Sequence, residues 1–187
     1  MNGTFKKLIK IGVNKFSEKG YYGTSMQEIS DELGIRKPSL YNYIDSKEDL
    51  FIKCLEICEV ENINIIQSIN VESLSIQDSL ISFFEKYMLD NYYLIKFHIQ
   101  LSFVPNNIVY RVEEYNENLM NILNNQLKIL YKNQRIKVEE IEFLSIIKPF
   151  MAGEIFGKII MVHKNNLQIN KKNFIYNINL LLDNLLI

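Results

Sequence analysis

The sequence contains few of the residues that enzymes and metal proteins use for chemistry, and few that break helices. It has no tryptophan, two histidines, two cysteines, three prolines and seven glycines in 187 residues. So few prolines and glycines predict few turns and long helices. The chain also lacks a His-Glu-x-x-His run and a glycine-rich phosphate loop following a strand, which are signatures of catalytic and nucleotide sites. Composition therefore gives no support for an enzyme.

Long apolar runs and a strong net charge are missing as well. No apolar run approaches the roughly 18 residues that a membrane-spanning helix needs. The N-terminal stretch, residues 1–16, spaces its lysines through an amphipathic pattern and lacks the unbroken apolar core of a signal peptide. A formal net charge of −1 argues against a general polyanion binder. We expect a cytoplasmic protein that does not associate with membranes.

The two cysteines, Cys54 and Cys58, are four residues apart and would share one face of a helix. We interpret them as small buried residues on an apolar stripe. The alternative is a helical enzyme or metal protein that combines them with His98, but the cysteine spacing is not that of a zinc finger. We expect neither a metal nor a cofactor.

Apolar residues recur at helical spacing along the whole chain, and no alternating strand pattern appears. Phe5, Leu8, Ile9, Gly12, Val13 and Phe16 form one such face. The sequence predicts an all-α fold of about nine helices. They cover about 5–19, 24–33, 36–44, 46–58, 75–88, 91–103, 106–135, 139–164 and 173–187. The pattern around Pro149 allows this proline either to kink the eighth helix or to start it.

The second helix has clear boundary signals on both sides. Either Thr24 with Gln27 or Ser25 with Glu28 would form a capping box at its start. Gly34 would end it, because glycine readily adopts the left-handed conformation of a C-terminal cap. A third helix would begin almost at once, with a proline in its first turn.

The second and third helices together predict a helix-turn-helix, in which the second helix of the pair projects away from the core. Leu40 and Ile44 would hold the projecting helix, and Ser46 with Asp49 would begin the next one. An αα-hairpin with solvated charges fits the spacing alone equally well. The outward side chains have the types that bind base edges and phosphates, and they are Arg36, Lys37, Ser39, Asn42 and Tyr43.

Residues 16–51, "FSEKGYYGTSMQEISDELGIRKPSLYNYIDSKEDLF", resemble the N-terminal domain of the TetR family of bacterial transcription regulators. Two departures are mild: Ile44 replaces the usual phenylalanine, and Tyr43 stands where histidine is also common. The matching elements, in order, are Phe16, Gly20-Tyr21, Thr24-Ser25, Gly34-Ile35, Leu40-Tyr41-Asn42-Tyr43-Ile44 and Lys47-Glu48-Asp49-Leu50.

The resemblance implies a ligand-responsive regulator, expected to be a repressor, that binds a palindromic double-stranded DNA operator as a homodimer. It implies a DNA-binding domain over residues 1–46 and a ligand-binding and dimerisation domain over 47–187. The alternative is a helical scaffold or small-molecule-binding protein without DNA binding. The sequence does not name the operator, the effector or the regulated genes, and it does not separate repression from activation. The DNA-binding residues that we expect are Thr24, Ser25, Arg36, Lys37, Ser39, Tyr41, Asn42, Tyr43 and Lys47.

Two further sets of residues are expected in the C-terminal part. An apolar or aromatic effector would lie among aromatic side chains with a few polar groups, namely Tyr87, Tyr93, Phe97, His98, Phe103 and Tyr115. A dimer interface on the last two helices would use small residues that permit close helix approach together with apolar ones. These are Gly153, Phe156, Gly157, Ile160, Leu181 and Leu185.

Overall fold

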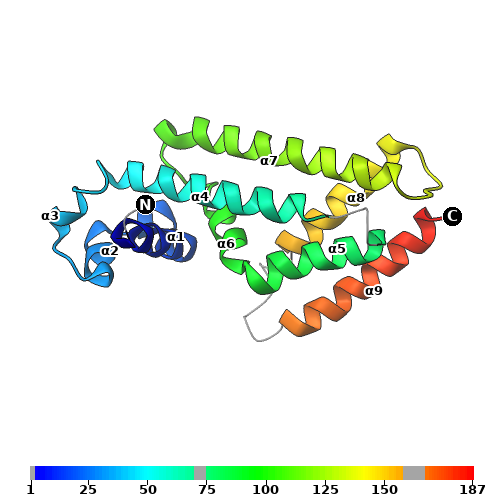
Figure 1. The fold of residues 1–187 in the computed structure, drawn as a ribbon, viewed down its shortest axis with the longest axis horizontal. Helices are drawn as coiled ribbons and strands as arrows, with labels where there is room; N and C mark the ends of the chain where they lie inside the picture. The colour runs from blue at the N-terminus through cyan, green and yellow to red at the C-terminus, as the bar shows by residue number, and fades with distance from the viewer. Residues whose placement is uncertain (1–2, 70–74, 158–166) are drawn as a thin grey trace. The chain divides into compact units, whose positions relative to one another are not determined.

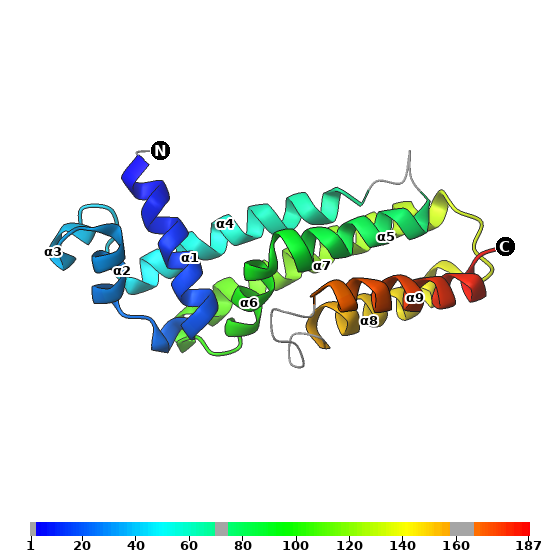
Figure 2. The ribbon, with the colours of Figure 1, turned by 90° about the horizontal axis from the view of Figure 1, so that it is seen from below.

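The computed structural model describes residues 3–69, 75–157 and 167–187. Over these residues the chain is all-α, as predicted, and its only β-type pairing is an isolated bridge between Ile136 and Leu186. The described part holds nine α-helices and two π-helical turns, shown in Figures 1 and 2. They are α1 (Gly3–Gly23), α2 (Met26–Leu33), α3 (Lys37–Leu40), α4 (Lys47–Gln67), α5 (Ile76–Glu85), η1 (Lys86–Asp90), α6 (Tyr92–Gln100), α7 (Asn106–Lys132), α8 (Glu140–Ala152), η2 (Gly153–Gly157) and α9 (Leu167–Leu185).

The chain divides into two compact units. Unit 1 combines residues 1–62 with 93–119, and unit 2 combines residues 63–92 with 120–187. Helices α4 and α7 therefore contribute residues to both units. The functional division that the sequence suggested, at residues 46/47, is a different one and stays a prediction.

An aromatic cluster forms the centre of unit 1. Phe16 of α1 meets Phe51 of α4 edge-on with ring centroids 5.0 Å apart, and Phe51 stacks on Phe97 of α6 at 5.5 Å. All three side chains are fully buried. Since such pairs add to the free energy gained from burial alone, this cluster ties α1 to α4 and α6.

Helix α1 is broken at Gly20, where the sequence predicted its end. Gly20 has φ 69° and ψ −179°, a conformation almost restricted to glycine. One more turn follows, so the helical segment reaches Gly23 rather than stopping at Gly20. A Cβ at position 20 would lie 2.5 Å from Oε1 of Gln100, so the α1 backbone passes close to the end of α6.

Within unit 2, α5 packs against α9, and the two helices lie beside each other in Figure 1. The rings of Phe84 and Phe174 stack with centroids 4.1 Å apart and an interplanar angle of 7°. Phe150 of α8 approaches the same ring at 5.9 Å. An ion pair between Glu85 and Lys171 adds a polar contact at the edge of this stack.

The C-terminal helices settle one open alternative and differ from the predicted boundaries elsewhere. Of the two alternatives for Pro149, the structure excludes a helix start, because Pro149 lies inside α8 with its side chain exposed. Beyond Ala152 the described chain continues as the π-helical turn η2, and residues 158–164 of the predicted helix lie outside the described residues. Helix α9 begins at Leu167, six residues before the predicted start at Asn173, because the polar run Asn170, Lys171 and Lys172 interrupts the apolar pattern on which the prediction rested.

Candidate DNA-binding interface

The support helix of the helix-turn-helix, α2, is fixed at its start by a complete capping box. The Ser25 hydroxyl accepts a hydrogen bond from the Glu28 backbone N–H at 3.1 Å, and the Glu28 carboxylate accepts one from the Ser25 backbone N–H at 3.1 Å. This confirms the second of the two predicted capping pairs. A side-chain hydrogen bond from Lys19, and the one from the Ser25 backbone, lower the pKa of Glu28 to about 2.

Thr24 does not cap α2. Its hydroxyl donates to the Gly20 carbonyl at 2.8 Å, and its side chain is only 2% exposed. Gln27, its predicted partner, donates instead to Asp31 at 2.7 Å. Thr24 therefore ties the end of α1 to the start of α2, and its hydroxyl is not presented to a phosphate.

The turn between α2 and α3 has the predicted glycine cap. Gly34 adopts the left-handed conformation, with φ 77° and ψ 28°, and its N–H donates to the carbonyl of Asp31 at 3.1 Å. The N–H of Ile35 closes the turn by donating to the Ser30 carbonyl at 3.0 Å. These bonds satisfy the last carbonyl groups of α2 and turn the chain into α3.

Helix α3 is shorter than predicted. It ends at Leu40, whereas the sequence suggested an end near Tyr43–Ile44. Hydrogen-bonded turns follow the helix: the N–H groups of Tyr43 and Ile44 both donate to the Leu40 carbonyl, at 2.9 and 3.3 Å. Leu40 and Ile44 are buried and hold the segment against the core, as predicted.

The outer side of this segment presents most of the expected DNA-binding side chains to solvent. Arg36, Lys37 and Asn42 are exposed, and Tyr41 is 47% exposed. Ser39, Tyr43 and Lys47 are half-buried, and Ser25 is exposed at the start of α2. The arrangement thus combines groups suited to base edges with groups suited to phosphates.

Helix α4 begins next to this surface. The Ser46 hydroxyl accepts a hydrogen bond from the Asp49 N–H at 3.0 Å, and the Asp49 carboxylate accepts one from the Asp45 N–H at 3.0 Å. The ammonium group of Lys47 lies 4.5 Å from the centroid of the Tyr21 ring. Partial burial lowers the pKa of Lys47, and the ring compensates with a cation–π contact.

Comparison with known proteins agrees with this geometry. The family described as "Bacterial regulatory proteins, tetR family" matches residues 8–54. The biofilm operon icaADBC HTH-type negative transcriptional regulator IcaR of Staphylococcus epidermidis is 30% identical over 151 residues, which cover 80% of this chain and 81% of IcaR.

The chain belongs to the TetR family.

Solved structures of TetR-family regulators share the fold. A transcriptional regulator from Aquifex aeolicus VF5 superposes with a TM-score of 0.72 at 22% identity, covering 96% of this chain and 99% of that one. FadR from Bacillus subtilis, solved in complex with stearoyl-CoA, gives a TM-score of 0.67 at 16% identity over 92% of this chain and 96% of its own. The predicted all-α architecture is therefore that of the family.

Membership of the TetR family makes the chain a transcriptional regulator with a helix-turn-helix and not an enzyme. The two cysteines of the enzyme or metal-protein alternative lie on α4. Cys54 and Cys58 are free and buried, and burial raises both thiol pKa values. Across residues 3–69, 75–157 and 167–187, no three His, Cys, Asp or Glu side chains gather as metal ligands. None of the helices in these ranges is long and apolar enough to span a bilayer.

The six aromatic and polar residues expected to line an effector pocket in this TetR-family chain have different surroundings, and the effector site stays a prediction. Phe97 is in the aromatic cluster of unit 1, and Tyr115 is buried and accepts a hydrogen bond from Asn62 at 3.0 Å. His98 lies near the Tyr115 ring, and burial lowers the pKa of its imidazole. Phe103 is 65% exposed, and Tyr87 is buried in unit 2.

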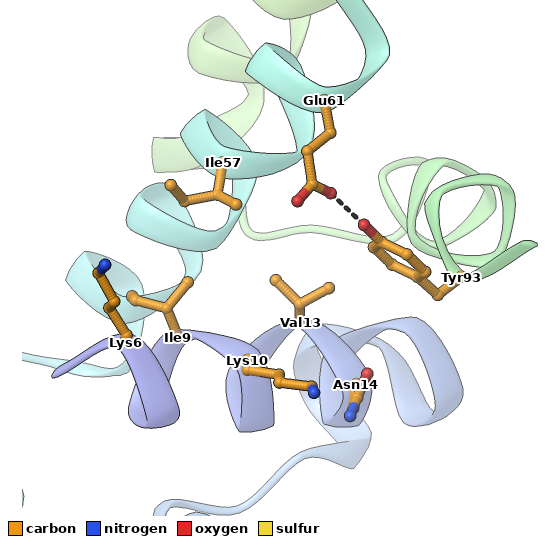
Figure 3. A pocket seen from close by; sticks show the side chains of 8 residues that line it. All are labelled: Lys6, Ile9, Lys10, Val13, Asn14, Ile57, Glu61 and Tyr93. Atoms are coloured by element: carbon orange, nitrogen blue, oxygen red, sulfur yellow. Dashed lines mark hydrogen bonds between the residues drawn. The ribbon is translucent and has the colours of Figure 1, made fainter. Parts of the chain in front are cut away.

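Tyr93 of that set lines a cavity within unit 1 that has a volume of about 450 Å³. Its hydroxyl donates to the Glu61 carboxylate (Figure 3). Burial, followed by this hydrogen bond, raises the pKa of Tyr93, so the phenol keeps its proton. The other lining residues come from α1 and α4 and are Lys6, Ile9, Lys10, Val13, Asn14 and Ile57.

Sequence reasoning missed these cavity residues. The apolar face of α1 was interpreted as core. Ile9 and Val13 are indeed buried, but they also line a cavity that the sequence did not predict. A weak signal was available, because Ile57 and Glu61 are four residues apart and put a carboxylate next to an apolar stripe of α4. Nothing in the sequence pairs Glu61 with Tyr93, 32 residues further along.

The expected dimer residues fall into three groups. Gly153, Phe156 and Gly157 are exposed on η2, and a Cβ at either glycine would meet nothing within 4 Å. Leu181 is half-buried, and Leu185 is 4% exposed within unit 2 and is therefore not available to a partner. Ile160 lies outside the described residues.

Proposed function

We propose that the chain is a cytoplasmic repressor that binds a two-fold symmetric DNA operator as a homodimer and is released by a small organic effector. IcaR from Staphylococcus epidermidis is a negative regulator, and we propose the same mode of action for this chain without assigning it the same operon. In this proposal the segment over residues 1–46 binds DNA, and residues 47–187 bind the effector and form the dimer.

The observation that carries the proposal is the outward surface of the helix-turn-helix. Its base-contacting candidates, Arg36, Lys37 and Asn42, are exposed beyond the buried anchors Leu40 and Ile44. Arginine or lysine can bind guanine in the major groove, and asparagine can bind adenine. Ser39, Tyr41, Tyr43 and Lys47, with the exposed Ser25, would contact the backbone; Thr24 contributes through the fold of the α1–α2 junction.

The exposed apolar surface of unit 2 supports dimer formation by a second copy of this chain. Phe156 on η2 and Tyr176 and Leu180 on α9 are exposed. Among the described residues nothing lies within 4 Å of a Cβ placed at Gly153 or Gly157, which would permit close approach of another helix. A symmetric dimer presents two recognition segments, which must meet successive major grooves about 34–36 Å apart. Dimer formation therefore sets the spacing of the operator half-sites.

DNA binding by purified protein tests this function. We expect the protein to protect a palindromic site in the promoter region of its own gene, with affinity that falls as salt rises. Arg36→Ala or Asn42→Ala should cost about 1–3 kcal/mol at one base position and relax the preference there. Asn118→Ala on α7 provides a control away from this surface. Absence of any salt-dependent DNA complex from folded, dimeric protein would contradict the proposal.

The oligomeric state is tested separately by sedimentation. The wild-type protein should sediment as a dimer, and Leu180→Glu should shift it toward monomer because the charge would be buried at the interface. Ile141→Glu changes an exposed residue of α8 in the same unit and serves as a control for the added charge. A wild-type monomer at the concentrations that bind DNA would rule out this interface.

A further inference from the structure

The cavity of unit 1 is bounded by three helices that are far apart in sequence. Helix α1 supplies Ile9 and Val13, α4 supplies Ile57 and Glu61, and α6 supplies Tyr93. In Figure 3 the apolar side chains of α1 point toward the space below α4, and the Glu61 carboxylate turns into it to meet the Tyr93 hydroxyl. A volume of about 450 Å³ is within the usual range for small-molecule sites.

At the partly buried end of this cavity, the Glu61–Tyr93 pair offers hydrogen-bond acceptors, whereas the donors Lys6, Lys10 and Asn14 lie on its exposed α1 side. Tyr93 has one hydroxyl proton and donates it to Oε2 of Glu61. What the pair still offers is the second carboxylate oxygen of Glu61 and the lone pairs of the phenol. No hydrogen bond to Oε1 of Glu61 is present among the described residues. A ligand that satisfies these groups must supply N–H or O–H donors.

The charges that line the cavity further restrict the kind of ligand that it can bind. Glu61 is partly buried, and a charge-assisted hydrogen bond to a carboxylate is stronger than a neutral one. Lys6 and Lys10 line the cavity from α1, but both are exposed, so water and salt screen them. The charge that acts at short range on a molecule inside the cavity is therefore the negative charge of Glu61.

We propose that this cavity binds an organic cation with N–H donors, such as a primary amine or an amidine, on an apolar or aromatic body. The cationic group would donate to Glu61 and the Tyr93 oxygen, and the body would lie against Ile9, Val13 and Ile57. The ring of Tyr93 adds a face that attracts cations. The binding claim concerns unit 1 alone, and only its consequence for DNA rests on the proposed function.

Such a site adjoins the DNA-binding segment directly. Ile9 and Val13 belong to the same helix as Gly20, whose carbonyl accepts the hydrogen bond from Thr24 at the start of α2. A ligand held between α1, α4 and α6 thus contacts the helix that supports α2. An effector at this site acts on DNA binding only through its different affinities for the DNA-bound and free conformations.

A fluorescent probe tests the site without DNA. Dansylcadaverine carries a primary amine on an apolar fluorescent body, and dansylaminohexanoic acid carries a carboxylate on a similar one. We expect fluorescence enhancement with the amine and little with the acid. Glu61→Gln should weaken amine binding by about tenfold or more, because a charged hydrogen bond is lost, whereas Glu56→Gln on the exposed side of α4 should leave it unchanged.

Two further variants separate the cation proposal from its opposite. Lys6→Gln with Lys10→Gln should leave amine binding unchanged or strengthen it, because two like charges are removed. Ile57→Trp should abolish binding by filling the cavity, and thermal melting of each variant shows that it is folded. Equal amine binding by wild type and Glu61→Gln, or preferred binding of the acid that depends on the two lysines, would overturn the proposal.

Operator binding in the absence of probe is measured in parallel. If the wild-type protein binds the amine but no DNA, the proposed function fails and the site stands. If the protein binds DNA normally but its binding of the amine does not depend on Glu61, the proposed cation site is wrong and the proposed function stands.

Discussion

The ammonium group of Lys47 lies 4.5 Å above the centre of the Tyr21 ring, so the first residue of α4 is held against the last turn of α1. This contact fixes where the positive charge of Lys47 sits before DNA arrives. A charge that is already positioned loses less side-chain entropy when it binds a phosphate.

Replacement of Lys47 should therefore weaken DNA binding without changing sequence preference. We expect Lys47→Ala to lower affinity evenly across operator variants and to reduce the slope of log affinity against log salt by about 1. Tyr21→Leu should have a smaller effect in the same direction, and Tyr21→Phe, which retains the ring, almost none. Lys53→Ala, on the same helix, is the charge-matched control. Titration over a range of salt concentrations provides the measurement.

The two glycines with positive φ should differ in their tolerance of a side chain. Gly34→Ala should destabilise the protein by about 1–2 kcal/mol through left-handed backbone strain alone, because a Cβ there meets nothing within 4 Å. Gly20→Ala should cost more, since it combines a conformation that is almost restricted to glycine with a Cβ only 2.5 Å from Gln100. Chemical denaturation measures both. If Gln100→Ala restores part of the stability lost in Gly20→Ala, that part is due to the close contact and the rest to backbone strain. Equal losses of stability at the two glycines would contradict this prediction.

Gly12 should be sensitive for a different reason, the close packing of α1 on α4. A Cβ at this helical position would lie 2.7 Å from Sγ of Cys54 and 3.4 Å from Leu50. We expect Gly12→Ala to destabilise the fold by about 1–3 kcal/mol through overpacking, despite the higher helix propensity of alanine. Cys54→Ala in the same chain should restore part of the loss. A stabilised Gly12→Ala single variant would show that the two helices separate without cost.

Acid should weaken the start of α2 through Glu28. Its folded-state pKa is about 2, below the ordinary value of 4.5, so its contribution to stability is complete above about pH 4.5 and is lost as pH falls toward 2. Glu28→Gln keeps a side chain that can cap the helix but removes this titration. Melting temperatures between pH 7 and pH 3 should fall less steeply for Glu28→Gln than for wild type. Identical pH profiles for the two proteins would mean that the pKa of Glu28 is the same in the folded and the unfolded chain, which would contradict this prediction.

The helix-turn-helix was predictable because its boundaries depend on local chemistry. Ser25, Glu28 and Gly34 act on backbone groups within a few residues of themselves, and all three have the roles that the sequence assigned. The sequence left Thr24 and Ser25 as alternative caps because a threonine at position 24 has two possible hydrogen-bond partners. The break in α1 brings the Gly20 carbonyl close enough to accept a hydrogen bond from the Thr24 hydroxyl, so this hydroxyl does not cap α2.

The cavity and the behaviour of Pro149 depend on contacts that are distant in sequence. The Glu61–Tyr93 hydrogen bond requires α4 and α6 to pack side by side, and no local pattern specifies that. Pro149 removes one backbone donor from α8, but it lies on the exposed side, where water can satisfy the carbonyl left behind. Periodicity alone could not distinguish this from a new helix start.

The aromatic cluster that joins Phe16 to Phe51 and Phe97 has a consequence for protein engineering. A hybrid regulator in which only residues 1–46 are replaced by those of another protein would lose Phe16. Phe51 and Phe97 would then pack against an unrelated helix. Hybrids with a new operator specificity should therefore keep α1 and α4 of this chain and graft only the outward positions of residues 36–43. The piece of this protein that can be transplanted is a surface and not a domain.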